Sequence, residues 1–289
     1  MTNINPRVDL AFKKIFGSVE NKDLLISFIN SVVSKEDQVA DVELLNPYNP
    51  QNFALDKLSI LDIKAKDCHG KYYNIEIQIS NEADYDKRAL YYWAKLYAEQ
   101  LQSGMGYGKL SKAIGIHVLN FISIPDNKAY HNKFHITNAV TNEHYFKDME
   151  MHTIELSKFI EGIDEDIDLM LPRIRTSLDR WAAFLTRAHY FNKDALPQEL
   201  NEPYIKKAID VLSHINLNKQ ERDFYEGHLK WLMIEENTLE KARSDGKEEG
   251  KIEGKIEVAK HLIAKGFDDK MIFETTGLTV QEVKKYFPN

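Results

Sequence analysis

The chain has 289 residues, 43% hydrophobic and 29% charged, which is typical of a folded protein with one large domain, or one domain and an appendage, and not of a disordered chain. Its formal net charge of −7 argues against the broad basic surface of many nucleic-acid binders, although it leaves room for a local basic cleft. Cys68 is the only cysteine, and neither a signal-peptide core nor an apolar run of about 18 residues is present, so we expect a cytoplasmic protein without disulfides, a cysteine-rich zinc site or a membrane span.

Residues 9–33 are predicted to be helical because apolar side chains recur at every third and fourth position. Gly17 is expected to interrupt this stretch, with a second helix beginning near Asn21. Asp9 fits the N-cap of the first helix, where an aspartate accepts backbone N–H bonds. Lys13 follows one turn later on the same side, and is either a solvated helix residue or a contact to a phosphate.

Residues 39–45 are predicted as a strand and residues 57–80 as an antiparallel hairpin, because two runs of alternating apolar and polar residues flank a polar break that contains Gly70. Asp62 and Lys64 share one face of the first arm, and Glu76 and Gln78 share one face of the second. Neighbouring strands lie about 4.8 Å apart, so Asp62 and Glu76 can share one divalent cation. The alternative is a polar face that points to solvent.

Residues 84–103 are predicted as a helix with an apolar stripe. Its arginine and tyrosines suit phosphate binding and base stacking, but tyrosines that pack the helix onto the sheet are the simpler interpretation. Residues 113–122 are a near-continuous apolar run, typical of a buried strand, and we interpret His117 within it as a satisfied core or edge histidine. Further strands are expected at 134–139 and 149–156, and the histidines near them do not match a compact metal motif.

From Asp164 onward the pattern is helical. Residues 245–257 repeat Gly-Lys-x-Glu with period four; because glycine is a poor helix former, this segment is either a helix supported by another chain or a flexible hinge. The end of the chain is predicted to hold two short helices around 276–279, with Thr279 and Glu282 as a capping box. This segment is similar to a helix-turn-helix, and we favour a docking or dimerising element over a reader of a DNA groove.

Four pieces in chain order resemble the PD-(D/E)XK nuclease family transposases, or Rpn-type recombination-promoting nucleases. They are D-x-x-F-K-x-x-F-G at 9–17, N-I-E-x-Q at 74–78, a tyrosine-rich helix at 88–100, and charged Gly-x-x-E-Gly repeats followed by T-G-L-T at 276–279. The resemblance implies an α/β (α+β) fold, with a restriction-endonuclease-like core whose mixed sheet is flanked by helices, followed by a helical C-terminal region. The core is expected as a helix, a three-stranded antiparallel meander, a helix and a further strand. We expect a nuclease-like core at 1–160, a helical extension at 161–244, and a charged Gly-rich linker with the helix-turn-helix-like segment at 245–289.

The resemblance also implies a Mg²⁺-dependent DNA endonuclease, for which Mn²⁺ can substitute, linked to DNA recombination or mobile elements. Asp62 and Glu76 would ligate the metal together with the backbone carbonyl of Ile77, and Asp9 would be a further acid of the site. Gln78 stands where most of the superfamily has lysine; it can position water or phosphate but supplies no charge. Rpn-type relatives also carry glutamine there, so we do not take the site as dead. Weaker candidates for substrate contacts are Lys13, Lys64, Arg88 and Gln100.

One alternative to the nuclease remains open at the level of the sequence. The chain is also interpretable as a non-catalytic, DNA-associated or oligomerising protein whose nuclease fold has lost turnover. The period-four repeat fits a homodimer, and DNA is the expected partner in either case. A true transposase lacks support, because no second catalytic domain is recognisable and a family label does not establish strand transfer.

Overall fold

The computed structural model describes residues 4–48, 63–81, 84–160, 162, 165–192 and 194–285. The chain divides into two compact units, Met1–Glu235 and Glu236–Asn289. No helix within the described ranges is long and apolar enough to cross a membrane.

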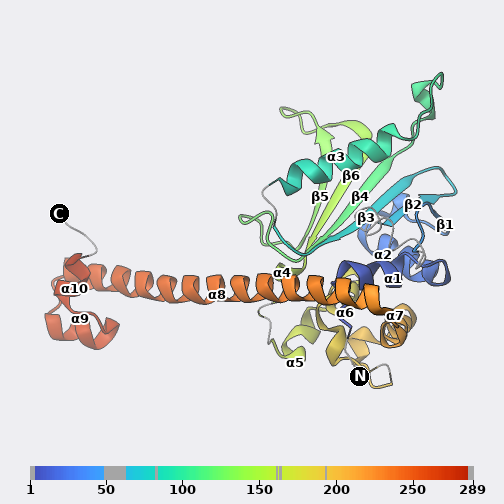
Figure 1. Ribbon diagram of the computed structural model, residues 1–289. Helices are drawn as coiled ribbons and strands as arrows, with labels where there is room; N and C mark the ends of the chain where they lie inside the picture. Colours follow the sequence, from blue (N-terminus) through green and yellow to red (C-terminus); the bar gives the residue numbers. More distant parts are fainter. Residues whose placement is uncertain are drawn as a thin grey trace. The chain divides into compact units, whose positions relative to one another are not determined.

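A mixed sheet is the centre of the first unit (Figure 1). Within the described ranges it has six strands in the order β1-β2-β3-β4-β6-β5. Strands β1, β2 and β3 form an antiparallel meander, β3, β4 and β6 run parallel, and β5 is antiparallel to β6. Their bounds are β1 Val42–Leu44, β2 Ile63–Asp67, β3 Tyr72–Gln78, β4 Ala113–Leu119, β5 His131–Thr137 and β6 His144–Glu155.

The order of elements confirms the expected core. Helix α3 (Tyr85–Ala98) connects β3 to the parallel strand β4, which is the crossover that parallel strands require. The predicted hairpin is present in its described part, with Gly70 in the turn at φ 87°, a left-handed conformation that glycine adopts without strain. The first strand is shorter than the predicted 39–45.

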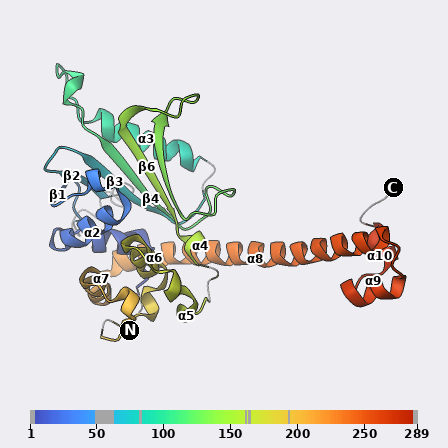
Figure 2. The ribbon, with the colours of Figure 1, turned by 180° about the vertical axis from the view of Figure 1, so that it is seen from behind.

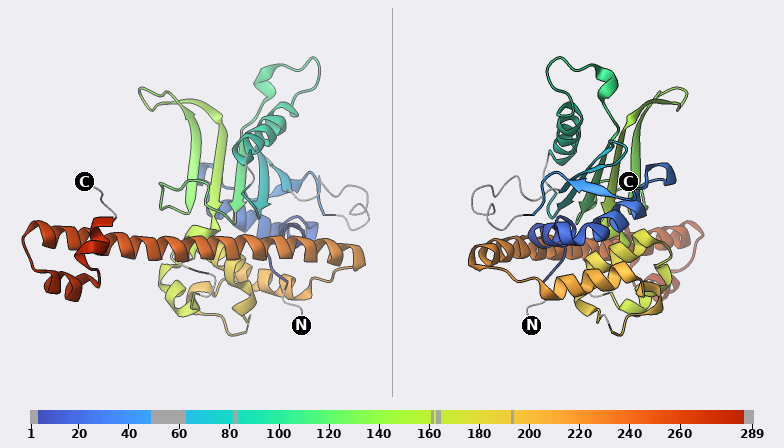
Figure 3. Two further views of the ribbon diagram at one scale, coloured as in Figure 1. Left: turned by 60° about the vertical axis from the view of Figure 1, so that its left-hand side comes forward. Right: turned by 90° about the vertical axis from the view of Figure 1, so that its right-hand side faces the viewer.

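Different helices cover the two faces of the sheet, as Figures 2 and 3 show. On one face, α3 packs Ala89, Trp93 and Leu96 against β4 and the start of β6. On the other face, α1 (Asp9–Phe16), α2 (Lys22–Val32), α6 (Ser177–Arg187) and α7 (Pro203–His214) share the main core with the sheet. Because side chains alternate along a strand, the apolar Ile75 and Ile77 enter this core, and Asn74 and Glu76 lie on the α3 side.

The remaining helices of the first unit are α4 (Leu156–Phe159), α5 (Ile167–Met170) and the start of α8 (Lys219–Ala264). Helix α8 packs Tyr225 and Leu232 into the main core. The helix extends to Ala264, so residues 245–257 are helical.

The second unit has a small core of its own between the end of α8, α9 (Asp269–Thr276) and α10 (Val280–Lys285). Ile256, Ala259, Ile272 and Val283 are its buried residues. The predicted capping box is confirmed, because the Thr279 hydroxyl accepts from the Glu282 backbone N–H and the Glu282 carboxylate accepts from the Thr279 backbone N–H.

Candidate active site

Glu76 lies in mid-strand on β3, on the face that α3 covers. The parallel register pairs it with His117 of β4, and pairs His117 with Thr153 of β6. His117 Nδ1 lies 3.8 Å from Glu76 Oε2. This separation is within the range of an ion pair but too long for a hydrogen bond. The fold therefore places an imidazole directly beside the carboxylate that the sequence singled out.

His117 is not the satisfied core histidine that we expected. Its side chain is only 1% exposed, and neither ring nitrogen has a hydrogen-bond partner within the described part of the chain. Burial, together with the charges of His152 and Arg88, lowers the pKa of His117 to about 4, so the ring is neutral near pH 7. A buried polar group without a partner costs about 1–3 kcal/mol, which marks the position as unusual.

Two features hold the ring of His117 in place. The ring of Tyr85, from α3, contacts it edge-on with centroids 6.0 Å apart. Gly115 leaves room on the strand itself, because a Cβ at that position would lie 3.0 Å from His117 Nε2. The ring therefore leans over Gly115 while its Nδ1 faces Glu76.

Helix α3 brings Tyr85 and Arg88 to the same part of the sheet. The guanidinium carbon of Arg88 lies 5.8 Å from the centroid of the Tyr85 ring. Burial and the nearby Glu76 raise the pKa of the Tyr85 hydroxyl, and Arg88 acts in the opposite direction. Arg88, a weak candidate from the sequence, thus lies among the groups around Glu76.

The first arm of the hairpin is described only from Ile63 onward, so Asp62 lies outside the described residues. Ile63 pairs with Ile75 and Lys64 pairs with Asn74, which confirms that Lys64 lies on the polar face that also carries Glu76. The Lys64 backbone N–H donates to Asn46 Oδ1 at 2.7 Å.

Gln78 lies at the end of β3, and its Nε2 donates to the Ser80 carbonyl at 3.3 Å. The Gln78 carbonyl accepts from the Asn120 N–H, on the β4 side of the strand. Because carbonyls alternate along a strand, the carbonyl of Ile77 points the other way, towards β2.

Asp9 and Lys13 each contact a residue other than Glu76. Asp9 is buried and its Oδ1 lies 2.7 Å from His228 Nδ1 of α8. It is the first residue of α1 and not its N-cap, which is Val8, so the capping prediction is wrong. Lys13 is 1% exposed and donates to the Asn46 carbonyl at 2.7 Å, so it is not a solvated helix residue.

Gln100 joins the end of α3 to the segment before β4. Its Nε2 donates to the Ser111 carbonyl at 3.0 Å, and its Oε1 accepts from the Ser111 N–H at 2.8 Å. This pair of hydrogen bonds positions the backbone that leads into β4, which is a structural role.

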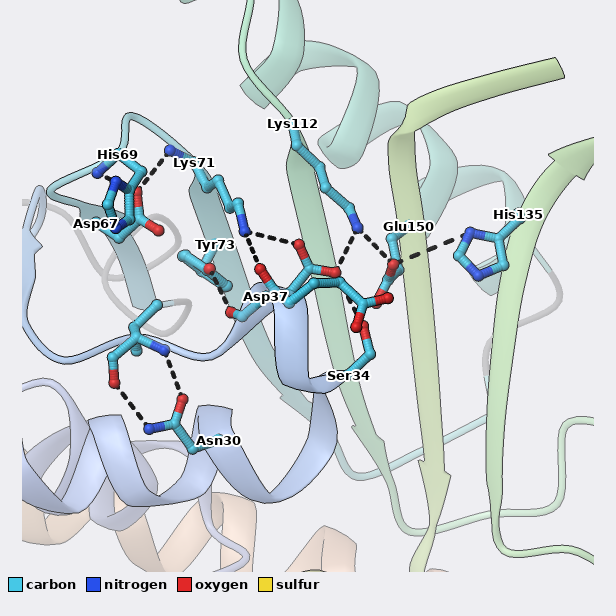
Figure 4. A network of polar contacts seen from close by, with 12 residues as sticks. Asn30, Ser34, Asp37, Asp67, His69, Lys71, Tyr73, Lys112, His135 and Glu150 are labelled. Carbon is cyan, nitrogen blue, oxygen red and sulfur yellow. Dashed lines mark hydrogen bonds and ion pairs between the residues drawn. The ribbon is translucent and has the colours of Figure 1, made fainter. Parts of the chain in front are cut away.

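A second polar network lies at the opposite end of β3 and β4 (Figure 4). Lys112 Nζ contacts Asp37 Oδ2 at 2.6 Å and Glu150 Oε2 at 2.7 Å. Burial would raise the pKa of Glu150, but hydrogen bonds from His152 and Lys112 outweigh it and lower that pKa. At Asp37, too, burial would raise the pKa, but the hydrogen bonds from Lys112 and Lys71 outweigh it and the pKa is lowered. These ion pairs join Asp37, in the 3-10 helix Lys35–Asp37, to the residues just before β3 and β4 and to β6.

The fit of the site to a metal rests on its donor set. Among the described residues no three His, Cys, Asp or Glu side chains come together in a way that holds a metal ion. Glu76, one of the expected ligands, lies at mid-strand on β3, whereas Asp62, the other, lies outside the described residues. A half-buried carboxylate at mid-strand and a backbone carbonyl are oxygen donors, which suits Mg²⁺.

From the sequence His117 was interpreted only as a satisfied core or edge histidine, and Tyr85 was missed. Their position became visible only through the β3–β4 register and the crossover helix. The one available signal was Gly115, two residues before His117 in an otherwise apolar strand, since glycine in a strand often marks a close approach.

One of the comparisons with known proteins identifies a family. The family model of the PD-(D/E)XK nuclease family transposases matches residues 6–242 of the 289. No curated protein and no solved structure matches. The match spans the sheet, α3 and most of the helices that follow.

Proposed function

The chain belongs to the PD-(D/E)XK nuclease family transposases, and on that premise we propose that it is a metal-dependent DNA endonuclease linked to DNA recombination or mobile elements. The observation that carries this proposal is Glu76, a half-buried carboxylate at mid-strand with His117 at its side. An acidic residue in the middle of a strand is unfavourable for folding. Its presence there therefore points to a functional role. A nuclease of this family acts on phosphodiester bonds, so DNA is the proposed partner. The exposed thiol of Cys68 suits the reducing cytoplasm that we propose as its location.

Asp62 and Glu76, with the carbonyl of Ile77, are the proposed ligands of Mg²⁺, for which Mn²⁺ can substitute. Two neighbouring residues support this proposal: Ile63, which follows Asp62 in the sequence, pairs with Ile75, which precedes Glu76. The Ile77 carbonyl points towards β2, the strand that follows Asp62 in the sequence. Asp9 remains a proposal as a further acid of the site, although its recorded contact is with His228.

When bound, Mg²⁺ lowers the pKa of a water and neutralises charge on the scissile phosphate. The chain's own groups bind and orient the DNA. Arg88 carries a fixed positive charge beside the site, and Lys64 adds a second from β2; both suit the phosphate backbone. Gln78 orients a water or a phosphate oxygen by hydrogen bonding, since it cannot act as a base near neutrality.

Plasmid cleavage tests this proposal. The purified chain is incubated with supercoiled DNA and Mg²⁺, Mn²⁺ or EDTA, beside Asp62→Ala and Glu76→Ala. We expect metal-dependent nicking or linearisation that both substitutions abolish. Cleavage that survives both substitutions, or that persists in EDTA, would contradict the proposed site.

Gln78 favours one competing function. A glutamine where most of the superfamily has lysine fits a protein that binds DNA without turnover. DNA binding without cleavage by any form of the chain, in a gel-shift assay run beside the cleavage assay, would favour this reading over the nuclease.

We propose in addition that the chain forms a homodimer in which α8 pairs with its copy in parallel. Between residues 246 and 257 the side chains of α8 follow lines of period four: lysines 247, 251 and 255 form one line, and glutamates 249, 253 and 257 form another. The lysine line and the glutamate line lie on either side of a line of glycines at 246, 250 and 254. A second helix that packs on these glycines therefore contacts both the lysines and the glutamates. A parallel pair related by a twofold axis along the helices places lysines beside glutamates, whereas an antiparallel pair places like charges together.

Charge reversal tests the dimer. Replacing the three lysines with glutamate is expected to give a monomer in sedimentation, and replacing the three glutamates with lysine as well is expected to restore the dimer. A wild-type chain that is monomeric at every concentration measured, or a dimer that is indifferent to the lysine replacements, would refute the pairing.

A further inference from the structure

We propose that His117 is a positioning residue for Glu76, and that its Nδ1–H orients the Glu76 carboxylate for metal binding. This inference rests on the proposed function, since it assumes that Glu76 is a metal ligand. It starts from the one buried imidazole that the strand register places next to that carboxylate.

The geometry is close to a hydrogen bond without being one. His117 Nδ1 and Glu76 Oε2 are 3.8 Å apart, and a hydrogen bond between these atoms requires about 2.7–3.2 Å. The two residues are register neighbours on adjacent strands, so their side chains stand next to each other on one face of the sheet, and the positioning role requires only a small change in the Glu76 side chain. The Glu76 side chain keeps 16% of its surface exposed, whereas His117 keeps 1%.

The ring itself is fixed. Tyr85 lies edge-on against it, and Gly115 supplies the space under Nε2 that any side chain would fill. A ring held in this way presents Nδ1 in a constant direction, which is what a positioning group requires.

The ring has no other hydrogen-bonding task among the described residues. Neither nitrogen has a hydrogen-bond partner there, and Glu76 is the charged group recorded against Nδ1. Carboxylates that ligate metals are themselves hydrogen-bonded, and loss of such a partner typically weakens metal binding or activity by about 10–100-fold. The Nδ1–H of His117 supplies that partner for Glu76.

Three substitutions separate positioning from simple filling of the core. His117→Asn places an amide N–H near the position of Nδ1, His117→Gln places one near the position of Nε2, and His117→Leu has neither. If His117 only fills space, the smaller Asn is the most damaging of the three and Gln and Leu are the mildest. If His117 positions Glu76 through Nδ1, the order for metal binding is reversed and Asn is the mildest.

The experiment measures the dissociation constant of Mn²⁺ by calorimetry on the full chain, and the metal concentration for half-maximal plasmid cleavage. We expect His117→Leu and His117→Gln to weaken Mn²⁺ binding by about 10–100-fold, and His117→Asn to stay within about threefold of wild type. Circular dichroism of each variant shows whether it is folded. If either His117→Leu or His117→Gln fails to fold, the other still tests the loss of Mn²⁺ binding.

The outcomes distinguish this inference from the proposed function. Metal-dependent cleavage that requires Glu76, together with unchanged Mn²⁺ binding in His117→Leu, or with His117→Asn as weak as His117→Leu, overturns the positioning role alone. A wild-type chain that binds no Mn²⁺ overturns both.

Discussion

Replacing Lys112 with methionine removes the cation that joins Asp37 to Glu150 in the network of Figure 4. The side chains of Asp37 and Glu150 are 5% and 1% exposed, so water cannot solvate the two carboxylates when the lysine is removed. Methionine keeps most of the length of the lysine stem, so the change is mainly one of charge. Unfolding by urea at about pH 7, followed by circular dichroism, measures its effect on the free energy of unfolding.

The expected magnitude follows from the contacts. A hydrogen bond to a charged group contributes about 1.5–3 kcal/mol, and Lys112 makes two. Breaking a buried ion pair costs about 3–5 kcal/mol. Asp37 keeps Lys71 at 2.8 Å, and Glu150 keeps His152 at 2.7 Å, which reduces the loss. We therefore expect about 3 kcal/mol, or a shift of the urea midpoint by about 1 M for an m-value of about 3 kcal/mol/M.

The pH dependence has a definite sign. The pKa values of Asp37 and Glu150 are lowered in the folded chain, so the unfolded chain binds more protons as the pH falls, and the network loses its contribution in acid. Burial would lower the pKa of Lys112, but its hydrogen bonds to Asp37 and Glu150 outweigh it and raise that pKa, so the contribution is also lost in strong alkali, above about pH 10.5. The cost of Lys112→Met should thus be smaller at about pH 4 than at pH 7.

An exposed pair provides the control. Lys95 and Glu99 are 3.7 Å apart and about half exposed, so Lys95→Met should change stability by less than about 0.5 kcal/mol. A cost of Lys112→Met below about 1 kcal/mol, or one that is equal at both pH values, would refute the reasoning about buried charge.

Three further predictions concern the site and its surroundings. Gly115→Ala should displace the His117 ring and cost about 1–3 kcal/mol in thermal unfolding, because its Cβ would lie 3.0 Å from Nε2; an unchanged melting temperature would contradict the close approach. Asp9→Asn should cost about 1–2 kcal/mol in urea unfolding through its bond to His228, and a neutral result would mean that this contact contributes nothing to stability. Gln78→Lys should raise the single-turnover rate of cleavage by about tenfold, equivalent to about 1.4 kcal/mol of barrier; a loss of activity would mean that glutamine is required in its own right.

Local sequence pattern was sufficient to predict the hairpin, whereas the order of elements in the core was expected from the family resemblance. The alternation around Gly70 predicted which residues of β3 enter the core, and the register confirms that Lys64 and Glu76 lie on the other face. Helix α3 was predicted from an apolar stripe that included Leu90 and Trp93. The helix is present and Trp93 is buried, but Leu90 is exposed, and Tyr85, Ala89 and Leu96 complete the buried face instead. These features depend on neighbours in the chain, which a sequence displays directly.

Long-range contacts were not accessible in the same way. His117 is unusual only because β4 lies beside β3, and Asp9 has a partner 219 residues away. Lys13 was expected either as a solvated helix residue or as a contact to a phosphate, yet its side chain is buried and its ammonium group donates to the Asn46 carbonyl. The repeat at 245–257 was ambiguous because its glycines oppose a helix while its Lys–Glu pairs support one.

The role of Glu76 is the central claim, and the most direct test is the single-turnover rate of plasmid cleavage by Glu76→Gln in saturating Mg²⁺. The matched control is Glu43→Gln, which makes the same change at an exposed acid on β1. We predict that Glu76→Gln slows cleavage by at least about 100-fold, while Glu43→Gln stays within about twofold of wild type. Cleavage by Glu76→Gln at the wild-type rate would contradict the account.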